Sequence, residues 1–253
     1  IQQPVCTFQS GGANMAASPS YGTGSGNIRT CSIVVADGDT NGAVTFSVAY
    51  EDSAGNAGVA DTTPDSGAVT IDNTHPTASA AVLAVGGTGN GNNGDSMTLT
   101  ITPSETIGTP TCVFKSGGVT MANTVSYSTS NADHICTIAV ADADTDGTVT
   151  FTLDFSDSAG NAATQVTSAS SGAVTIDNTH PTLSTPAITV NGAGNANNGD
   201  TVTLTFTSST DVTTAPTCAF TDGGSNAMDA GTSTASGNAA GWTCTVAVGD
   251  SDS

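Results

Sequence analysis

The segment "SGAVTIDNTHPT", residues Ser66–Thr77, is written again without change at Ser171–Thr182, 105 residues further along the chain. The same offset relates "GDSMTLTITPS", which begins at Gly94, to "GDTVTLTFTSS", which begins at Gly199. A period of this length matches the usual size of an independently folding domain and is too long for a solenoid repeat. The sequence therefore predicts tandem domains, with the repeated segment where one domain joins the next.

Three copies of the pattern are present, and only the middle copy is complete. Placing the joints after Asp72 and Asp177 gives domains of residues 1–72, 73–177 and 178–253. The first domain lacks the beginning of the pattern and the third lacks its end. We expect a window from a longer tandem array, because two fragments that completed each other between chains would duplicate the middle of the pattern.

The composition excludes several classes of protein. The chain has 2 basic and 22 acidic residues and a net charge of −20, which argues against nucleic acid and anionic membrane surfaces as partners. We expect no membrane insertion of this segment, because the sequence has no long apolar run. Charged residues make up only 9% of the chain and apolar residues alternate regularly, so we expect folded domains.

The six cysteines occur as one pair in each domain. The recurring spacing predicts the disulfides Cys6–Cys31, Cys112–Cys136 and Cys218–Cys244. No zinc-type cysteine or histidine spacing is present, so paired cysteines indicate an oxidising compartment. Closing a loop of about 25 residues stabilises a domain by roughly 3 kcal/mol.

Apolar residues alternate with threonine in several short segments, and the period of two predicts half-buried β-strands. The inward residues are expected to be those of the following sets: Met97, Leu99 and Ile101; Val149, Phe151, Leu153 and Phe155; Val202, Leu204 and Phe206; Cys112 and Phe114; Cys136, Ile138 and Val140. About seven short strands in each 105-residue period predict an all-β fold, a two-sheet antiparallel sandwich of the Ig-like kind, with the disulfide inside its core.

Three motifs carry a resemblance to a known family. "DNTHPT" at the joint, "DSAGN" before the last strand and "GDTVTLTFT" near the start of a domain resemble the bacterial-type Ig-like repeats of giant extracellular surface proteins. That resemblance covers the whole chain, and it implies stalks, adhesins and filament subunits. The paired cysteines, and His75 and His180 in place of a small residue, depart from the family's pattern.

Two aspartate-rich loops admit two interpretations. "DGDTNG" contains Asp37, Asp39 and Asn41, and "DADTDG" contains Asp142, Asp144 and Asp146. Alternating carboxylates before a glycine favour calcium, but the glutamate that completes an EF-hand loop is absent. The alternative is a hairpin turn, for which Asn-Gly and Asp-Gly are preferred.

The joints also admit two interpretations. Calcium between domains would use Asp72 and Asn73 at the first joint and Asp177 and Asn178 at the second. The alternative is an exit turn, because Pro76 and Pro181 force His75 and His180 into extended geometry. We favour the exit turn, since one aspartate at each joint supplies too few calcium ligands.

No catalytic centre is expected. His75 and His180 occupy the same joint position, and no strained nucleophile turn such as G-x-S-x-G occurs. We therefore expect a non-enzymatic structural segment of a long extracellular or cell-surface fibre, in contact with copies of itself. The alternative is the stalk of a calcium-dependent adhesin.

Overall fold

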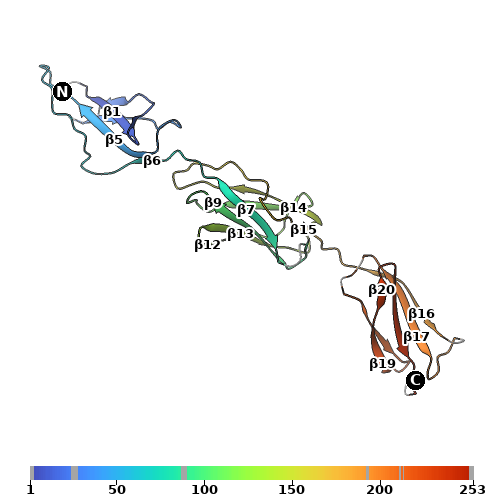
Figure 1. The fold of residues 1–253 in the computed structure, drawn as a ribbon. Coiled ribbons are helices and arrows are strands. Elements are labelled where there is room, and N and C mark those ends of the chain that lie inside the picture. The colour runs from blue at the N-terminus through green and yellow to red at the C-terminus, as the bar shows by residue number, and fades with distance from the viewer. Residues whose placement is uncertain are drawn as a thin grey trace. The chain divides into compact units, whose positions relative to one another are not determined.

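The computed structural model describes residues 3–23, 28–86, 90–191, 194–210, 212 and 214–250, except for the side chains of 229–232. Its regular structure there consists of strands (Figure 1). None of the described residues forms a helix with the length and apolar character to cross a membrane. The chain divides into two compact units, residues 1–178 and 179–253, and the first unit contains two of the predicted domains.

The second domain contains both sheets of a sandwich. One sheet has the order β12 (Ser126–Ser130), β13 (Asp133–Ala139), β9 (Ser96–Pro103) and β7 (Ala78–Val85). The other has the order β11 (Val119–Thr120), β10 (Thr111–Ser116), β14 (Gly147–Asp154), β15 (Thr175–Ile176) and β8 (Asn90–Gly91). Apart from the short parallel pair β15–β8, the strands are antiparallel. When the short strands β8 and β11 are left out, seven strands remain, and the first, second, fourth and fifth form one sheet while the third, sixth and seventh form the other. This division is that of an Ig-like fold.

The core of the second domain lies between these sheets. Met97, Leu99 and Ile101 of β9 are fully buried, and they belong to the same cluster as Phe114 and Leu153 of the facing sheet. The threonines between the β9 residues are half-buried. The period-two prediction is therefore confirmed for this domain.

The first domain contains one full sheet and one short one. The full sheet has the order β2 (Ala13–Asn14), β1 (Val5–Ser10), β5 (Gly42–Ala49) and β6 (Thr70–Ile71). The short sheet is the pair β3 (Ser20–Thr23) and β4 (Arg29–Ser32). The strands that correspond to β7 and β9 of the second domain have no counterpart among the described residues before Val5.

The third domain keeps the opposite part of the pattern. Its four-stranded sheet has the order β16 (Leu183–Val190), β17 (Thr201–Ser208), β21 (Gly241–Ala247) and β20 (Ser236–Asn238). Beside it lies the pair β18 (Thr217–Thr221) and β19 (Ala227–Thr234). Phe206 is buried as predicted, whereas Val202 and Leu204 are only half-buried because the facing sheet is smaller.

The hairpin interpretation of the aspartate-rich loops is wrong. Residues 140–146 connect β13 to β14, and these strands belong to opposite sheets. The equivalent residues 33–41 connect β4 to β5, again between sheets. A type I′ turn joins two paired neighbours, so it cannot make this connection. Asn-Gly and Asp-Gly here provide Gly42 and Gly147 with φ of 136° and 135°, where each following strand begins.

Equivalent side chains between the sheets are more buried in the second domain than in the first. Their removal should therefore lower the free energy of unfolding more in the second domain. Leu153→Ala removes a fully buried side chain and should lower the free energy of unfolding of the second domain by about 3 kcal/mol. Val48→Ala, at the equivalent half-buried position, should cost the first domain less than about 1 kcal/mol. Native-state hydrogen exchange of the amides in β14 and β5 measures both. Equal losses would contradict the difference in burial.

Candidate functional site

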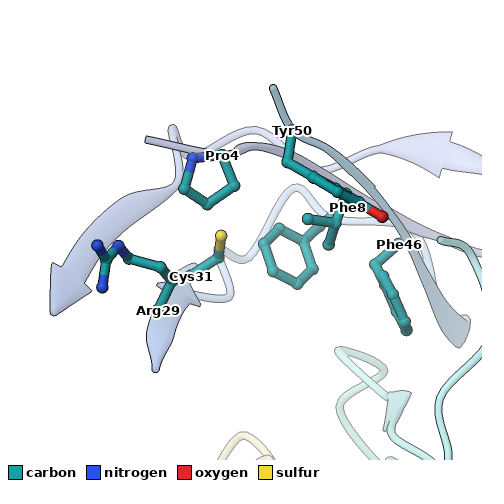
Figure 2. Close-up of a pocket in the computed structure, with 7 residues that line it drawn as sticks. Pro4, Phe8, Arg29, Cys31, Phe46 and Tyr50 are labelled. Carbon is teal, nitrogen blue, oxygen red and sulfur yellow. The ribbon is translucent and has the colours of Figure 1, made fainter. Parts of the chain in front are cut away.

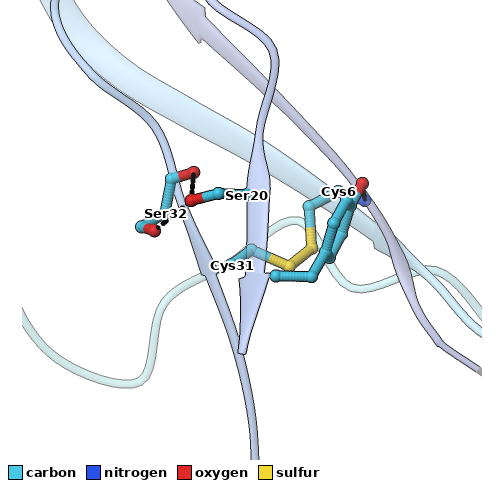
Figure 3. The surroundings of a disulfide bond; sticks show 5 residues. Cys6, Ser20, Cys31 and Ser32 are labelled. Atoms are coloured by element: carbon cyan, nitrogen blue, oxygen red, sulfur yellow. Dashed lines mark hydrogen bonds between the residues drawn. A yellow bond between two sulfur atoms is a disulfide. The ribbon is translucent and has the colours of Figure 1, made fainter. Parts of the chain in front are cut away.

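The disulfides connect the two sheets of each domain, and the predicted pairing is confirmed. Cys112 of β10 pairs with Cys136 of β13, and the equivalent pairs are Cys6–Cys31 and Cys218–Cys244. Figure 3 shows the first of these bridges beside Ser20 and Ser32, whose hydroxyl groups lie 2.8 Å apart across β3 and β4. In antibody domains the bridge joins the second and sixth strands. Here it joins the third and fifth, so it crosses the core at a different point.

The aspartate-rich loops are built around one buried carboxylate each. Oδ2 of Asp39 accepts a hydrogen bond from the Ala36 amide at 2.8 Å, and Oδ1 accepts one from the Ala16 amide at 2.7 Å. These bonds lower the pKa of the Asp39 carboxyl, the Ala36 bond most strongly. Asp144 repeats the arrangement with the amides of Ala141 and Ala122, both at 2.8 Å. Each carboxylate therefore binds its own loop to a second segment of the chain, the one that contains Ala16 or Ala122.

An asparagine holds each joint to the loop that precedes it. The Nδ2 of Asn73 donates to the carbonyls of Ala36 and Asp39, both at 3.0 Å, and its amide donates to Oδ1 of Asn41 at 2.7 Å. At the second joint the Nδ2 of Asn178 donates in the same way to Ala141 and Asp144, at 2.9 and 3.0 Å. Its amide donates to Oδ1 of Asp146 at 2.7 Å. The aspartate-rich loop and the joint are thus one structural unit.

The "DSAGN" loop of the second domain holds the first joint from the other side. Asp157 accepts backbone hydrogen bonds from Ala159, Gly160 and Asn161, which fold residues 157–161 into a tight loop. The Nδ2 of Asn161 then donates to the carbonyl of Asp72 at 2.8 Å. Nδ1 of His75 lies 2.7 Å from the carbonyl oxygen of Ala162. Pro76, beside His75, is fully buried, while Pro181 at the second joint is exposed.

Three carboxylates meet at this first joint. Asp72, Glu105 and Asp157 each place an oxygen within 4.8 Å of the other two. The Oε1 atom of Glu105 is buried and has no hydrogen-bond partner. Its burial, and then the charges of Asp72 and Asp157, raise the pKa of the Glu105 carboxyl. Burial also acts to raise the pKa of Asp157, but hydrogen bonds from Asn161, Gly160 and Ala159 outweigh it and the net pKa is lowered.

This donor set suits a divalent cation with a preference for oxygen ligands. Calcium takes carboxylate oxygens in flexible geometry, and a cation here would satisfy the unpaired Glu105 oxygen. The predicted loop residues lie outside this set: Asp37 and Asp142 are exposed, and both oxygens of Asp39 and Asp144 already accept amide hydrogen bonds. Calcium binding by the loops stays a prediction.

Sequence reasoning identified Asp72 and Asn73 but missed Glu105, Asp157 and Asn161. The "DSAGN" motif was visible as a repeat, and its contact with the joint was not. Glu105 gave no signal of its own, because Thr210 occupies the equivalent position of the third domain. It comes close to the joint only through the fold.

Removing the Asp144 carboxylate should destabilise the second domain. Asp144→Ala leaves the amides of Ala122 and Ala141 without this acceptor, and we expect a loss of about 2–3 kcal/mol in the free energy of unfolding. Asp142→Ala, at an exposed neighbouring position, should change it by less than about 0.5 kcal/mol. Chemical denaturation, monitored by hydrogen exchange, gives the free energy of unfolding of both variants.

The prediction that the loop binds calcium is tested by calorimetry on a variant with Asp142→Asn and Asp144→Asn. Calcium uptake equal to that of the wild type would exclude this loop as a calcium site.

No protein-family model matches the sequence, and no curated protein is detectably similar to it. Among solved structures, the chain is similar to a three-domain titin fragment, an E-to-A variant of I67–I69, with 12% identity, coverage of 99% of this chain and 80% of that one, and a TM-score of 0.42. It is also similar to a tetra-tandem repeat from the extending region of a large adhesion protein, with 20% identity, coverage of 98% and 58%, and a TM-score of 0.32. A third similar structure is the Bacteroides ovatus mixed-linkage glucan utilization locus protein SGBP-B, with 14% identity, coverage of 96% and 59%, and a TM-score of 0.22.

Proposed function

We infer that this chain is a structural segment of a long extracellular fibre built from tandem Ig-like domains. One observation carries the proposal: both joints use the same clamp, in which Asn73 or Asn178 is bound by the carbonyls of the preceding aspartate-rich loop. Because each joint is bound by hydrogen bonds to the domain that it leaves, a pulling force reaches that domain at a fixed point. A free linker would need none of these contacts.

The disulfides support a mechanical role. Each bridge ties the two sheets of a domain together, so a pulled domain can lengthen only outside the bridged loop. Disulfides persist in oxidising compartments, which supports an extracellular or cell-surface location. The shared motifs at the joints support a relationship with the bacterial-type repeats of surface proteins.

Contacts with copies of the chain form part of this proposal. Repeated heterologous contacts that do not close produce filaments, and the two joints share one sequence, so each offers the same residues for such contacts. The net charge of −20 opposes close approach. At physiological salt this repulsion is screened beyond roughly 8 Å, so it acts only at contact. Electron microscopy of native material tests the fibre, which single beaded rods without lateral order would refute.

The first joint should lose order when its second contact is removed. Asn161→Ala deletes the bond from Nδ2 to the Asp72 carbonyl, and Asn56→Ala is a matched control. Asn56 has the same place in the first "DSAGN" loop and also binds its aspartate, but it makes no described contact with a joint. Small-angle scattering of the full chain should show a broader distribution of dimensions for Asn161→Ala alone. The same broadening in both variants would contradict a role at the joint.

A second candidate function is the stalk of a calcium-dependent adhesin. The observation that favours it is the group of Asp72, Glu105 and Asp157, with the buried, unpartnered Oε1 of Glu105. A cation held there would join the end of one domain to two loops of the next. The stalk would then stiffen on binding calcium, and its ligand-binding head would lie elsewhere.

Glu105→Gln should weaken calcium binding by at least about tenfold, because a hard ligand is replaced by a neutral amide. The chain has one other glutamate, the exposed Glu51, so Glu51→Gln is a control with the same change in charge. Calorimetry on the full chain measures both variants. No calcium uptake by the wild type, or equal uptake by both variants, would exclude the joint as a calcium site.

The raised pKa of Glu105 gives the calcium-free chain a defined pH dependence. A carboxyl with a raised folded-state pKa costs no stability below its ordinary pKa, and the cost appears as the pH rises through the raised value. Glu105→Gln should therefore stabilise the second domain at neutral pH, and this gain should disappear in acid. Thermal denaturation across pH in the presence of a chelator measures the gain.

A further inference from the structure

The second domain, whose two sheets are complete, has an open edge at β12. Its residues Ser126–Ser130 are all exposed, and they pair with β13 on one side and with no other strand among the described residues. In an antiparallel pair every second residue directs its N–H and C=O groups away from the partner strand. β12 therefore presents unpaired backbone donors and acceptors, which is the arrangement that accepts a further strand.

The edge strands at the other ends of these two sheets are covered or short. At the far end of the same sheet, residues 170–171 cover β7. The Leu83 amide donates to the Ser171 carbonyl at 3.1 Å, and the Ser170 amide donates to a β7 carbonyl at 2.8 Å. The facing sheet ends in β11 and β8, which have two residues each. Proteins use cover and shortening to prevent edge pairing, and β12 has neither.

The sequence of β12 also lacks the residues that discourage pairing. Residues 125–130 read "VSYSTS" and contain no lysine, no other charged residue and no proline. The register with β13 is continuous, without a bulge. In a chain with a net charge of −20, this strand is a place where two copies can approach without bringing like charges together.

The open edge recurs in the neighbouring domains. Tyr21 of β3 lies opposite Cys31 of β4, as Tyr127 of β12 lies opposite the equivalent cysteine of β13. Figure 2 shows Cys31 and Arg29 of β4, which line a pocket of this domain, and Tyr21 shares their face of the hairpin. Among the described residues β3 pairs with β4 alone, and β20 of the third domain likewise ends its sheet. Neither strand contains a charged residue, so the edge is a feature of the repeat.

We propose that β12 of one chain pairs antiparallel with β12 of a second copy about a two-fold axis at Ser128, an inference that rests on the proposed fibre and names one of its lateral contacts. Ser128 then lies opposite its own copy, and Tyr127 lies opposite Thr129 of the other chain. An aromatic residue beside a β-branched one is a favourable cross-strand pair. The two four-stranded sheets become one sheet of eight strands.

The side chains around β12 are compatible with this pairing. The Tyr127 hydroxyl lies 2.5 Å from Nδ1 of His134, so its ring is held toward β13 and leaves the backbone edge open. The nearest acidic residue is Asp133, whose Oδ1 accepts a hydrogen bond from Oγ1 of Thr102 at 2.6 Å. In the proposed pair the two Asp133 residues lie about 20 Å apart by strand geometry, beyond the screening length of roughly 8 Å.

A second copy is the occupant that fits this edge best. The strand is its own complement in the proposed register, and no opposite charge is present to attract a charged partner. Each domain of a second chain carries an edge of the same kind. Several weak contacts between two arrays can therefore act together, which a partner without the repeat does not offer.

Ser128→Cys in the full 253-residue chain tests the register. The two Cα atoms of residue 128 come within about 4.5–5.5 Å in an antiparallel pair, a separation that a disulfide spans. Mild oxidation should therefore give dimers linked through residue 128, identified by peptide mapping. Ser126→Cys is the matched control, because it is exposed on the same strand but lies about 14 Å from its own copy in this register. We expect at least about tenfold less dimer from the control. No dimer from Ser128→Cys, or equal yields, would overturn the proposal.

A pair of charge variants separates this contact from the fibre as a whole. Ser128→Asp places like charges opposite each other and should weaken association, measured by analytical ultracentrifugation, by at least about tenfold. Thr150→Asp adds the same charge at an exposed position of the other sheet and should leave association unchanged. Equal association of the wild type and both variants would overturn the β12 contact and leave the fibre proposal standing. A wild-type chain that stays monomeric at millimolar concentration would also overturn the contact, whereas microscopy of native material decides on the fibre.

Discussion

The side-chain amides of Asn73 and Asn178 bind the end of each domain to the aspartate-rich loop beside it. Each donates from Nδ2 to two backbone carbonyls of the preceding loop, and its backbone amide is bound by a side chain of that same loop. Buried backbone groups need partners, and a loop between two sheets has no ladder to provide them. The joint therefore completes the fold of the domain that it leaves, which explains why its sequence is repeated without change.

The inter-sheet disulfide compensates for a small core. The second domain fills the space between its sheets with few aromatic residues, and its largest fully buried side chains include Phe114, Met97 and Leu99. Cross-linking stabilises a domain mainly by restricting its unfolded chain, so this contribution does not require a large core. Among the described residues of the first and third domains, Cys6–Cys31 and Cys218–Cys244 likewise connect two sheets.

The sequence was sufficient for the fold class, the disulfide pairs and the inward faces of the strands, because these depend on local period and on spacing within one domain. How far a side chain is buried between the sheets depends also on the strands of the facing sheet. Phe46 and Phe151 occupy equivalent positions in the pattern, yet Phe46 is half-buried and Phe151 is buried. Glu105 likewise could not be assigned to the joint, because its neighbours Asp72 and Asp157 come from distant parts of the sequence. The hairpin interpretation of the loops fails because a turn motif does not reveal whether the next strand returns to the same sheet.

The acidic composition follows from the way the loops are built. Asp39, Asp52 and Asp157 each accept backbone hydrogen bonds, and each has a lowered pKa. Such carboxylates stabilise the fold above their ordinary pKa, and this contribution is lost as the pH falls through the lowered value. An aspartate that closes a loop needs no lysine or arginine partner, because backbone N–H groups donate hydrogen bonds to its carboxylate and stabilise the negative charge. A net charge of −20 can therefore arise from loop structure, repeated from domain to domain, without any acidic surface having been selected for a partner.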